Sequence, residues 1–384
     1  MSLYMFRLNN NRSDRLKTRV YGNNEKRVVV TILFFIGLFS TLLLLIPSAA
    51  KAQNHPEESK NRKEKITFRV VSWNVENLFD CRHDTLKNDY EFMPDAMRHW
   101  NYSKYKQKLA HISRVIAAVG EWNPPALIGL CEVENDSVLN DLTRRSPLKE
   151  LDYRYIITRS PDPRGIDVAL LYQRDVFKLL SFRPVGIPPI QGHHPTRDLL
   201  HVSGQLLTGD TLDVFVCHLP SRSGGAKASE PYRLQAARIL RQQADSIMHT
   251  RLHPQLIIMG DFNDYPYNAS IRQVLEAEAP SYPLLPKKLY HLLASQSKTK
   301  SFGSYKFHGE WGLLDHLIVS GTLLDTSSHF FTKESYAHIS RLPFLLTEDS
   351  KYGGKEPFRT YKGMKYNGGY SDHLPVYTDF ELYY

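Results

Sequence analysis

Residues 256–264, Leu-Ile-Ile-Met-Gly-Asp-Phe-Asn-Asp, place two polar side chains directly after an apolar run that is typical of a buried strand. Alternation along an extended chain predicts that Asp261 and Asn263 point to the same side. A carboxylate can hold or deprotonate a water molecule, and a carboxamide can donate to a phosphoryl oxygen without adding charge. The pair therefore suits a phosphate ester, although the same residues could form an Asx-rich turn that closes the strand.

Four further parts of the sequence bring polar side chains to the end of an apolar run. Glu132 or Glu134 could instead cap a helix that we predict over 136–145, and His218 could be a structural histidine at a strand end. Because all five places share one pattern, coincidence is the weaker explanation. The four are 68–77 with Asn74 and Glu76, 126–135 with Glu132 and Glu134, 212–218 with His218, and the pair 312–319 and 369–376 with Asp315 and His373.

In this order the motifs resemble the endonuclease/exonuclease/phosphatase superfamily, which includes deoxyribonuclease I-like nucleases, apurinic endonucleases, bacterial sphingomyelinases and inositol polyphosphate 5-phosphatases. The resemblance covers roughly residues 66–382. It implies an α/β (α+β) fold, a four-layer sandwich in which two mixed β-sheets pack face to face with helices on the outside. The motifs are Trp73-Asn74-Val75, Glu132, Cys217-His218, Gly260-Asp261-Phe262-Asn263, Leu314-Asp315-His316 and Ser371-Asp372-His373-Leu374-Pro375.

The resemblance implies catalytic roles for five of these residues. Asn74 and Asn263 would orient the phosphate, and Asp261 would position or deprotonate the attacking water. His373, held by Asp315, would face the phosphate. This pairing also has a general physical basis, because a carboxylate fixes the tautomer of an imidazole and favours its protonated, donor form.

The resemblance also implies a metal site. It assigns Glu132 to the metal and puts Asp372 close to it, often through water, while His218 would stabilise the phosphorane or help the leaving oxygen. Glu76 matches a position where apurinic endonucleases have a metal-binding Asp, and whether it binds metal here stays open. The candidate ligand set consists of Glu, Asp and Asn, without the Cys pair or the His-x-x-x-His spacing that would suggest zinc. An oxygen-rich site favours Mg²⁺, with Mn²⁺ as the alternative.

Three residues are candidates for substrate binding. Arg164 and Asp167 lie where a turn leads into an apolar run, and Arg222 lies in a Gly-rich loop directly after His218. Each could equally be a solvated or structural loop residue. We interpret His194 and His316 as structural or surface residues.

The N-terminal segment predicts export. Residues 28–46 contain no charge and follow a stretch rich in Lys and Arg, and Ala50-Lys51-Ala52 has the small-x-small pattern of a cleavage site. We expect a signal peptide over 1–52, a flexible linker over 53–65 and a catalytic domain over 66–384, in the periplasm or outside the cell. The alternative is an uncleaved membrane anchor, because a run of this length can span a bilayer.

The net charge of the chain bears on the kind of substrate that we expect. Residues 1–52 hold eight of the 49 Lys and Arg and two of the 40 Asp and Glu, which leaves a net charge of +3 for the remainder. This weakens the case for a dedicated duplex nuclease.

The three cysteines show no disulfide pattern, and Cys131 and Cys217 fit buried apolar positions. We expect a monomer that binds a phosphate-ester substrate, with nucleic acid or nucleotide as the first choice, and no protein partner.

Two helices and one long loop complete the prediction. Apolar spacing predicts a helix over 103–119, with Gly120 after it, and a second helix over 231–248. Residues 341–369 predict a long loop that delivers Ser371, Asp372 and His373.

Three functions compete at this point. The first is an exported, metal-dependent phosphoesterase that cleaves a phosphodiester, with a small-molecule phosphatase as a variant of the same chemistry. The second is a phospholipase C or sphingomyelinase-like enzyme, which would need an exposed apolar hairpin for membrane contact. The third is a binding module without catalysis, which would lack a main catalytic residue, and none of them is missing.

Overall fold

The computed structural model describes residues 64–191 and 194–384. The predicted signal peptide and residues 53–63 of the predicted linker lie outside the described residues. The first strand, β1 (Lys65–Leu78), begins at the last residue of that linker. Within the described part of the chain, no helix has both the length and the apolar character needed to cross a membrane.

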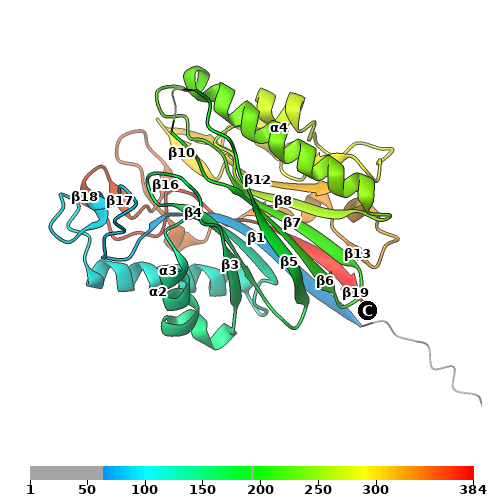
Figure 1. Ribbon diagram of the computed structural model, residues 1–384, viewed down its shortest axis with the longest axis horizontal. Helices are drawn as coiled ribbons and strands as arrows, with labels where there is room; N and C mark the ends of the chain where they lie inside the picture. The colour runs from blue at the N-terminus through cyan, green and yellow to red at the C-terminus, as the bar shows by residue number, and fades with distance from the viewer. Residues whose placement is uncertain (1–63, 192–193) are drawn as a thin grey trace, which may run out of the picture. The chain divides into compact units, whose positions relative to one another are not determined.

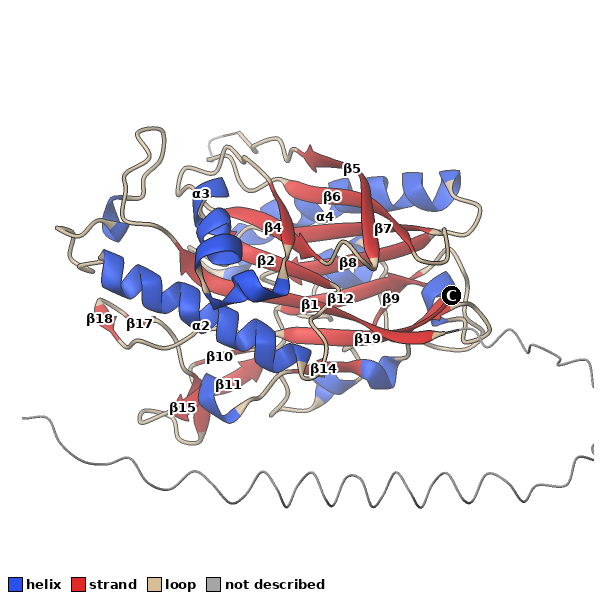
Figure 2. Cartoon of the chain, turned by 90° about the horizontal axis from the view of Figure 1, so that it is seen from below, coloured by secondary structure: helices blue, strands red, loops and turns tan. Residues whose placement is uncertain are grey.

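Two large β-sheets make up the centre of the fold (Figures 1 and 2). The seven-stranded sheet has the order β13-β19-β1-β2-β4-β3, with β14 also paired to β19, and the six-stranded sheet has the order β5-β6-β7-β8-β12-β9. Both sheets are mixed, since β1 is parallel to β2 and β7 is parallel to β8, while the other pairings are antiparallel. The strands of the first sheet are β1, β2 (Leu127–Val133), β3 (Arg154–Ile157), β4 (Asp167–Tyr172), β13 (Phe330–Phe331), β14 (Ala337–Ile339) and β19 (Val376–Tyr383). The strands of the second are β5 (Phe177–Val185), β6 (Leu199–Leu206), β7 (Thr211–His218), β8 (Gln255–Asp261), β9 (Leu289–His291) and β12 (Asp315–Ser320).

The central strands are apolar on both faces because each sheet is covered on both sides. Val70 of β1 and Ile257 of β8 belong to the core between the sheets. Their neighbours Val71 and Ile258 point the other way, into two outer clusters beneath the helices. Alternation along a strand thus supplies two cores, which explains the unbroken apolar runs in the sequence.

Helices cover the outer faces, so the fold is the predicted four-layer sandwich. The helix α2 (Tyr102–Gly120) packs Leu109, Ile112 and Ile116 against the first sheet, and α4 (Ala226–Thr250) packs Leu240 and Ala244 against the second. Figure 1 shows the two helices along different sides of the sheets. The helix predicted over 103–119 lies within α2.

Two helix predictions differ from the structure, one at its start and one in its continuity. The helix α4 begins before Pro231, because the Arg233 side chain donates to the carbonyl of Ala226 and stabilises the first turn (2.8 Å). The helix predicted over 136–145 is divided into α3 (Asp136–Asn140), capped by the Asn135 side chain, and a π-helical turn, Asp141–Arg145. The other short 3-10 or π segments are Tyr90–Phe92, Pro147–Leu151, Ser270–Val274, Gln296–Lys298, Gly321–Leu324, Glu334–Tyr336 and Pro343–Leu345.

The segment 341–369 is more ordered than the long loop that the sequence predicted. It contains two short hairpins, β15 (Leu346–Glu348) with β16 (Lys355–Pro357), and β17 (Tyr361–Lys362) with β18 (Lys365–Tyr366). A third hairpin, β10 (Tyr305–Phe307) with β11 (Glu310–Gly312), packs beside it, because Lys306 forms a buried ion pair with Asp349 (2.7 Å). Few apolar residues repeat in this segment, so periodicity could not reveal the hairpins.

Candidate active site

Strand register aligns three predicted site residues at one end of the second sheet. In the parallel pair β7 and β8, His218 lies opposite Asp261. In the antiparallel pair β8 and β12, Asp315 lies opposite the same Asp261. Three polar side chains from distant segments thus meet in one row because hydrogen-bonded strands keep their partners opposite one another.

The turn after β8 depends on Gly260 and Asn263. Gly260 has φ +141°, and a Cβ atom there would lie 1.8 Å from the carbonyl oxygen of Cys217, so only glycine fits beside β7. The strand ends at Asp261, and Asn263 has φ +52°. Its backbone N–H donates to Asp261 Oδ1 (2.9 Å), and its side chain donates to the carbonyl of Leu219 (3.0 Å). Strand alternation was therefore the wrong reason for their proximity, and an Asx-type turn brings the two residues together.

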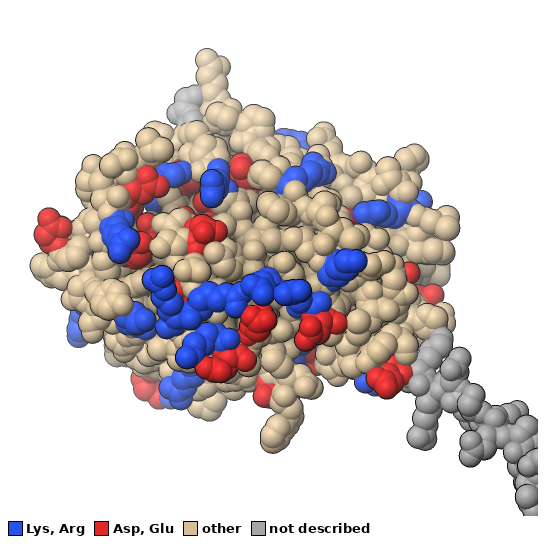
Figure 3. Space-filling model, turned by 60° about the horizontal axis from the view of Figure 1, so that its bottom comes forward, with Lys and Arg blue, Asp and Glu red and all other residues tan. Residues whose placement is uncertain are grey.

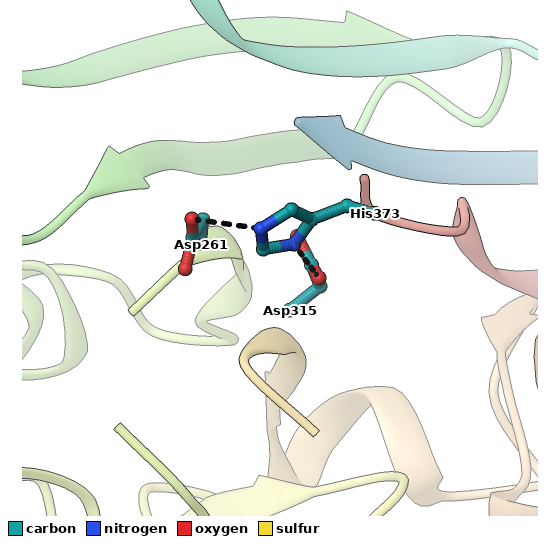
Figure 4. Close-up of side chains that lie close together, drawn as sticks. All are labelled: Asp261, Asp315 and His373. Atoms are coloured by element: carbon teal, nitrogen blue, oxygen red, sulfur yellow. Dashed lines mark hydrogen bonds and ion pairs between the residues drawn. The ribbon is translucent and has the colours of Figure 1, made fainter. Parts of the chain in front are cut away.

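Asp315, His373 and Asp261 form a chain of close contacts (Figure 4). His373 Nδ1 lies 2.7 Å from Asp315 Oδ2, and His373 Nε2 lies 3.8 Å from Asp261 Oδ2. Ser304 donates to the same Asp315 oxygen (2.5 Å). Ligand atoms of the three residues lie within 4.8 Å of one another, a spacing that could also hold a metal ion. All three side chains are buried, so the charges interact strongly.

The electrostatics favour a protonated imidazole beside a weakly acidic carboxyl group. Burial alone would lower the pKa of His373, but the Asp315 and Asp261 carboxylates raise it well above its usual value. Burial raises the pKa of Asp261 to about 7, against the opposing effect of the His373 charge. Asp261 can therefore gain and lose a proton near neutral pH.

Asn74 and His218 complete this cluster. Asn74 Nδ2 donates to Asp261 Oδ2 (3.0 Å), which ties the two sheets together at the site. His218 Nε2 lies 3.6 Å from the same oxygen, and its Nδ1 has no hydrogen-bond partner among residues 64–191 and 194–384. Burial, followed by the charges of Arg197 and Arg164, lowers the pKa of His218 well below its usual value, so this imidazole is neutral.

Glu76 and Glu132 lie at two β-bulges of the first sheet. The register of β1 with β2 shifts between Asn74 and Leu78, and that of β2 with β4 shifts between Cys131 and Val133. Both glutamates have positive φ, +53° and +65°, which is uncommon for residues other than glycine and concentrates at functional sites. The bulges turn both side chains out of the regular alternation of the sheet.

The two glutamates differ in their partners. Glu132 Oε2 accepts from the backbone N–H of Asn77 (2.9 Å), and the side chain is partly exposed. Glu76 is buried and accepts from the backbone N–H groups of Thr360 (2.5 Å) and Tyr361 (3.4 Å). Arg359 Nε lies 3.5 Å from Glu76 Oε1, the oxygen that accepts from Tyr361. Glu76 is thus engaged by protein donors, whereas Glu132 has more freedom to bind a ligand.

Two cations beside these carboxylates escaped the sequence analysis. Arg359 Nη2 donates to Asp372 Oδ2 (2.9 Å). Lys108 is buried, and its ammonium donates to Thr360 Oγ1 and the Tyr370 carbonyl (both 2.6 Å). Burial lowers the pKa of Lys108 to about 8, although the charges of Glu76, Asp372 and Glu132 oppose this shift. A lysine within the apolar stripe of α2 was a visible signal, whereas nothing around Arg359 pointed to the site.

The predicted substrate-binding residues lie in three different surroundings. Arg164 is exposed and donates to Asn77 Oδ1 (2.8 Å), the residue whose backbone N–H donates to Glu132. Asp167 is buried and accepts from Thr158 and Ser160, so its carboxylate holds the loop before β4. It also lines a polar cleft of about 690 Å³. Arg222 stacks over the ring of Tyr265 (4.5 Å) and lies 3.6 Å from Asp264.

Of the two histidines interpreted as structural or surface residues, His316 has structural contacts and His194 is exposed. His316 is buried between His291 and the carbonyl of Asp264, to which its Nε2 lies at 2.8 Å. His194 lines a cleft of about 460 Å³ together with Arg197. Cys131 and Cys217 are buried free thiols, and Cys81 is also free.

A sandwich of two mixed sheets covered by helices is the fold class of the endonuclease/exonuclease/phosphatase superfamily, and here an acid–imidazole–acid cluster lies at its strand ends. The model of the Endonuclease/Exonuclease/phosphatase family matches residues 69–382, and the chain belongs to this family. Members of this superfamily are hydrolases that act on phosphoester bonds, and they typically depend on a divalent metal. No curated protein gives a significant match.

Solved structures share the fold at low sequence identity. A family member from Bacteroides thetaiotaomicron has a TM-score of 0.52 and 15% identity, over 83% of this chain and 96% of that one. A mannosyl-6-phosphatase from the same species has a TM-score of 0.51 and 16% identity, over 82% and 99%. A family member from Bacteroides vulgatus has a TM-score of 0.50 and 15% identity, over 83% and 99%.

Two partly exposed carboxylates of the site fit a hard divalent cation. Glu132 and Asp372 offer carboxylate oxygens, and both side chains are partly exposed. The charges of both carboxylates act to raise the pKa of Lys108, so the two residues lie near the same buried cation. Each carboxylate has a bond to one protein donor group, Asn77 or Arg359, and therefore keeps oxygen lone pairs for a metal. An oxygen-donor set of this kind suits Mg²⁺ or Mn²⁺ better than zinc.

Proposed function

We propose that this chain is a divalent-metal-dependent phosphoesterase that hydrolyses a phosphodiester by in-line attack of water. The observation that carries the proposal is the position of Asp261. Its carboxylate lies within 3.0–3.8 Å of Asn74, His218 and His373, so one buried acid is surrounded by three groups that can contact a phosphoryl group. This arrangement suits the deprotonation of a water molecule beside a bound phosphate.

The chain's own residues divide the reaction between them. Asp261 takes a proton from the attacking water, whose oxygen bonds to phosphorus while the ester oxygen leaves. His373, kept protonated by Asp315, donates its Nε2–H to a phosphoryl oxygen, and the 3.8 Å gap to Asp261 leaves this donor available. Asn74 and Asn263 orient the phosphate without adding charge. The neutral His218 lies beside the same centre and can stabilise the leaving oxygen.

Glu132 and Asp372 would hold the metal, for which Mg²⁺ is our first choice and Mn²⁺ the second. When bound, such an ion offsets the negative charge of the phosphate and of the leaving oxygen. Glu76 would support the site from behind, since its oxygens already accept from Thr360, Tyr361 and Arg359.

The substrate is the finer part of the proposal. Figure 3 shows a stripe of Lys and Arg on one face, with Asp and Glu beside it, which would suit a short anionic segment better than a long duplex. Nucleic acid or nucleotide is our first choice of substrate, and the stripe bears only on the length of that substrate. A phosphomonoester is the second candidate, because one solved protein with this fold is a mannosyl-6-phosphatase.

A single set of assays tests the function. Hydrolysis of bis-p-nitrophenyl phosphate, p-nitrophenyl phosphate, plasmid DNA and sphingomyelin would be measured for the purified full chain with Mg²⁺ and with EDTA. We expect Mg²⁺-dependent turnover that falls by about 10³-fold in His373→Ala. His338→Ala removes an exposed histidine and serves as the matched control. Turnover that survives His373→Ala would contradict the assigned roles.

We further propose that the chain is exported. The proposal is supported by the uncharged run 28–46 and by the small residues at 50 and 52. N-terminal sequencing of the protein from fractionated cells tests it. A mature start at Gln53 in the periplasm or medium supports cleavage, and an intact N-terminus in the membrane fraction supports an anchor.

A further inference from the structure

Arg359 lies in the segment between β16 and β17, far in sequence from every motif of the site except 371–373. Its guanidinium bonds to Asp372 Oδ2 (2.9 Å) and reaches Glu76 Oε1 at 3.5 Å, the outer limit of a hydrogen bond. The side chain is 36% exposed, so one part of it lies against the carboxylates and another part is open to solvent.

Buried groups fix the backbone directly after Arg359. The N–H groups of Thr360 and Tyr361 both donate to Glu76, and Lys108 donates to Thr360 Oγ1 (2.6 Å). Three hydrogen bonds to buried side chains leave little freedom at this point of the chain. The position of Arg359 therefore follows from the packing of α2 and β1 rather than from a mobile surface loop.

Arg359 is connected to the reaction centre through Asp372 and Tyr305. Its partner Asp372 is the neighbour of His373 in the chain, so their Cα atoms are only about 3.8 Å apart. The ring of Tyr305 contacts that of His373 in a tilted arrangement, with 4.9 Å between the ring centroids. Burial raises the pKa of Tyr305 to about 12, and the charges of Asp372, Arg359 and Asp261 also act on it. Tyr305 thus borders both the catalytic cluster and the Arg359 pair.

The ion pairs of Arg359 do not account for its whole side chain. Glu76 already has two backbone donors, so it does not need a third partner to be satisfied. The bonds to Asp372 and Glu76 use two of the five N–H donors of the guanidinium. The remaining donors belong to a planar, permanently charged group on a side chain that is partly exposed.

We propose that Arg359 binds a non-bridging oxygen of the scissile phosphate, next to the oxygen that His373 contacts. Asp372 and Glu76 hold the guanidinium in the orientation for this contact, and Lys108 balances their charge. A fork of N–H donors matches phosphoryl oxygens in geometry and charge. This role rests on the proposed phosphoesterase function and adds a substrate-binding residue to it.

Binding of inorganic phosphate to the Mg²⁺-loaded full chain tests the proposal without turnover. Isothermal titration calorimetry would compare the wild type with Arg359→Gln, Arg359→Lys and the control Lys362→Gln, which removes an exposed cation from the same hairpin region. We expect the phosphate Kd to rise about 10- to 100-fold in Arg359→Gln and by less in Arg359→Lys. Lys362→Gln should stay within about twofold of the wild type. The kcat/KM for bis-p-nitrophenyl phosphate should fall in the same order.

Thermal unfolding of each variant separates binding from folding. If Arg359→Gln does not fold, Arg359→Lys decides, because it keeps a cation beside Glu76 and Asp372 without the planar fork. Phosphate affinity that is unchanged in a folded Arg359 variant overturns the proposal, and so does a wild type that binds no phosphate. A wild type that binds phosphate through Arg359 but hydrolyses none of the four substrates supports this inference and counts against the proposed function instead.

Discussion

The Asp261 carboxylate has a pKa set by its neighbours rather than by its own chemistry. Burial raises this pKa to about 7, while the charge of His373 and the donors Asn263 and Asn74 lower it. The balance leaves the acid able to change protonation state near neutral pH. Because the proposed reaction needs the ionised form, activity should be lost as the pH falls through this value.

Asn74→Ala tests that balance. The Asn74 amide stabilises the ionised carboxylate through its 3.0 Å hydrogen bond, so its removal should raise the pKa of Asp261. We expect the acidic limb of the kcat/KM profile to move upward by about half to one pH unit. The profile would be measured from pH 5 to 9 with bis-p-nitrophenyl phosphate and Mg²⁺. Asn123→Ala, at an exposed position, is the control, and a limb that stays or moves downward would show that Asp261 is not the titrating base.

At the scale of elements, several residues with positive φ lie at or next to strand ends. Glu76 and Asn77 close β1, Glu132 lies near the end of β2, and Asn263 follows β8, all with positive φ. Such conformations cost free energy and persist only where the surrounding structure holds them. Here the surrounding structure is two sheets covered on both faces, which can carry this strain while the strand ends shape the site.

Gly260→Ala should separate β7 from β8. A Cβ atom would lie 1.8 Å from the Cys217 carbonyl oxygen, and the backbone there has φ +141°. We expect a loss of about 3 kcal/mol or more in the free energy of unfolding, measured by urea denaturation. Gly209→Ala is the matched control, since it also has positive φ (+88°) but nothing within 4 Å, and it should cost about 1 kcal/mol. Equal losses in the two variants would mean that the contact with Cys217 is unimportant.

At the scale of the whole molecule, the site exists only where the two sheets meet. Asn74 and Glu132 come from the first sheet, Asp261 and Asp315 from the second, and His373 from the segment that precedes β19. A cation bound to Glu132 and Asp372 would therefore connect parts of the chain that separate on unfolding. Metal binding should then stabilise the fold as well as enable catalysis.

Glu132→Gln tests this link. We expect Mg²⁺ at about 100 times its Kd to stabilise the wild type by about 2.7 kcal/mol, which appears as a rise in Tm of a few degrees. The rise should be absent in Glu132→Gln and retained in Glu310→Gln, which alters an exposed glutamate. Differential scanning calorimetry with and without EDTA provides the measurement. A full rise in Glu132→Gln would move the metal to other ligands, such as the Asp261, Asp315 and His373 group.

Several residues show why prediction from sequence succeeded in part. Asp261 follows an apolar run with a glycine before it. This local pattern predicts both where the strand ends and that a carboxylate lies there. Asn263 was placed near Asp261 for the wrong reason, because periodicity does not reveal a turn with positive φ. Lys108 was visible as a charge within the apolar stripe of α2. Arg359 had no such signal, because its role depends on Asp372 and Glu76, the latter 283 positions away in the chain.

The sequence by itself determined the apolar runs, the two long helices and the polar residues at the strand ends, because these depend on periodicity and on neighbours within a few positions. Only the tertiary structure decided which of these side chains meet. Strand register placed His218 and Asp315 opposite Asp261. Two separate bulges gave Glu76 and Glu132 different hydrogen-bond partners. The packing of α2 brought Lys108 close to the carboxylates of Glu76, Asp372 and Glu132. Contacts of this kind join residues that are tens to hundreds of positions apart, and their energies arise from burial and charge that no local pattern contains.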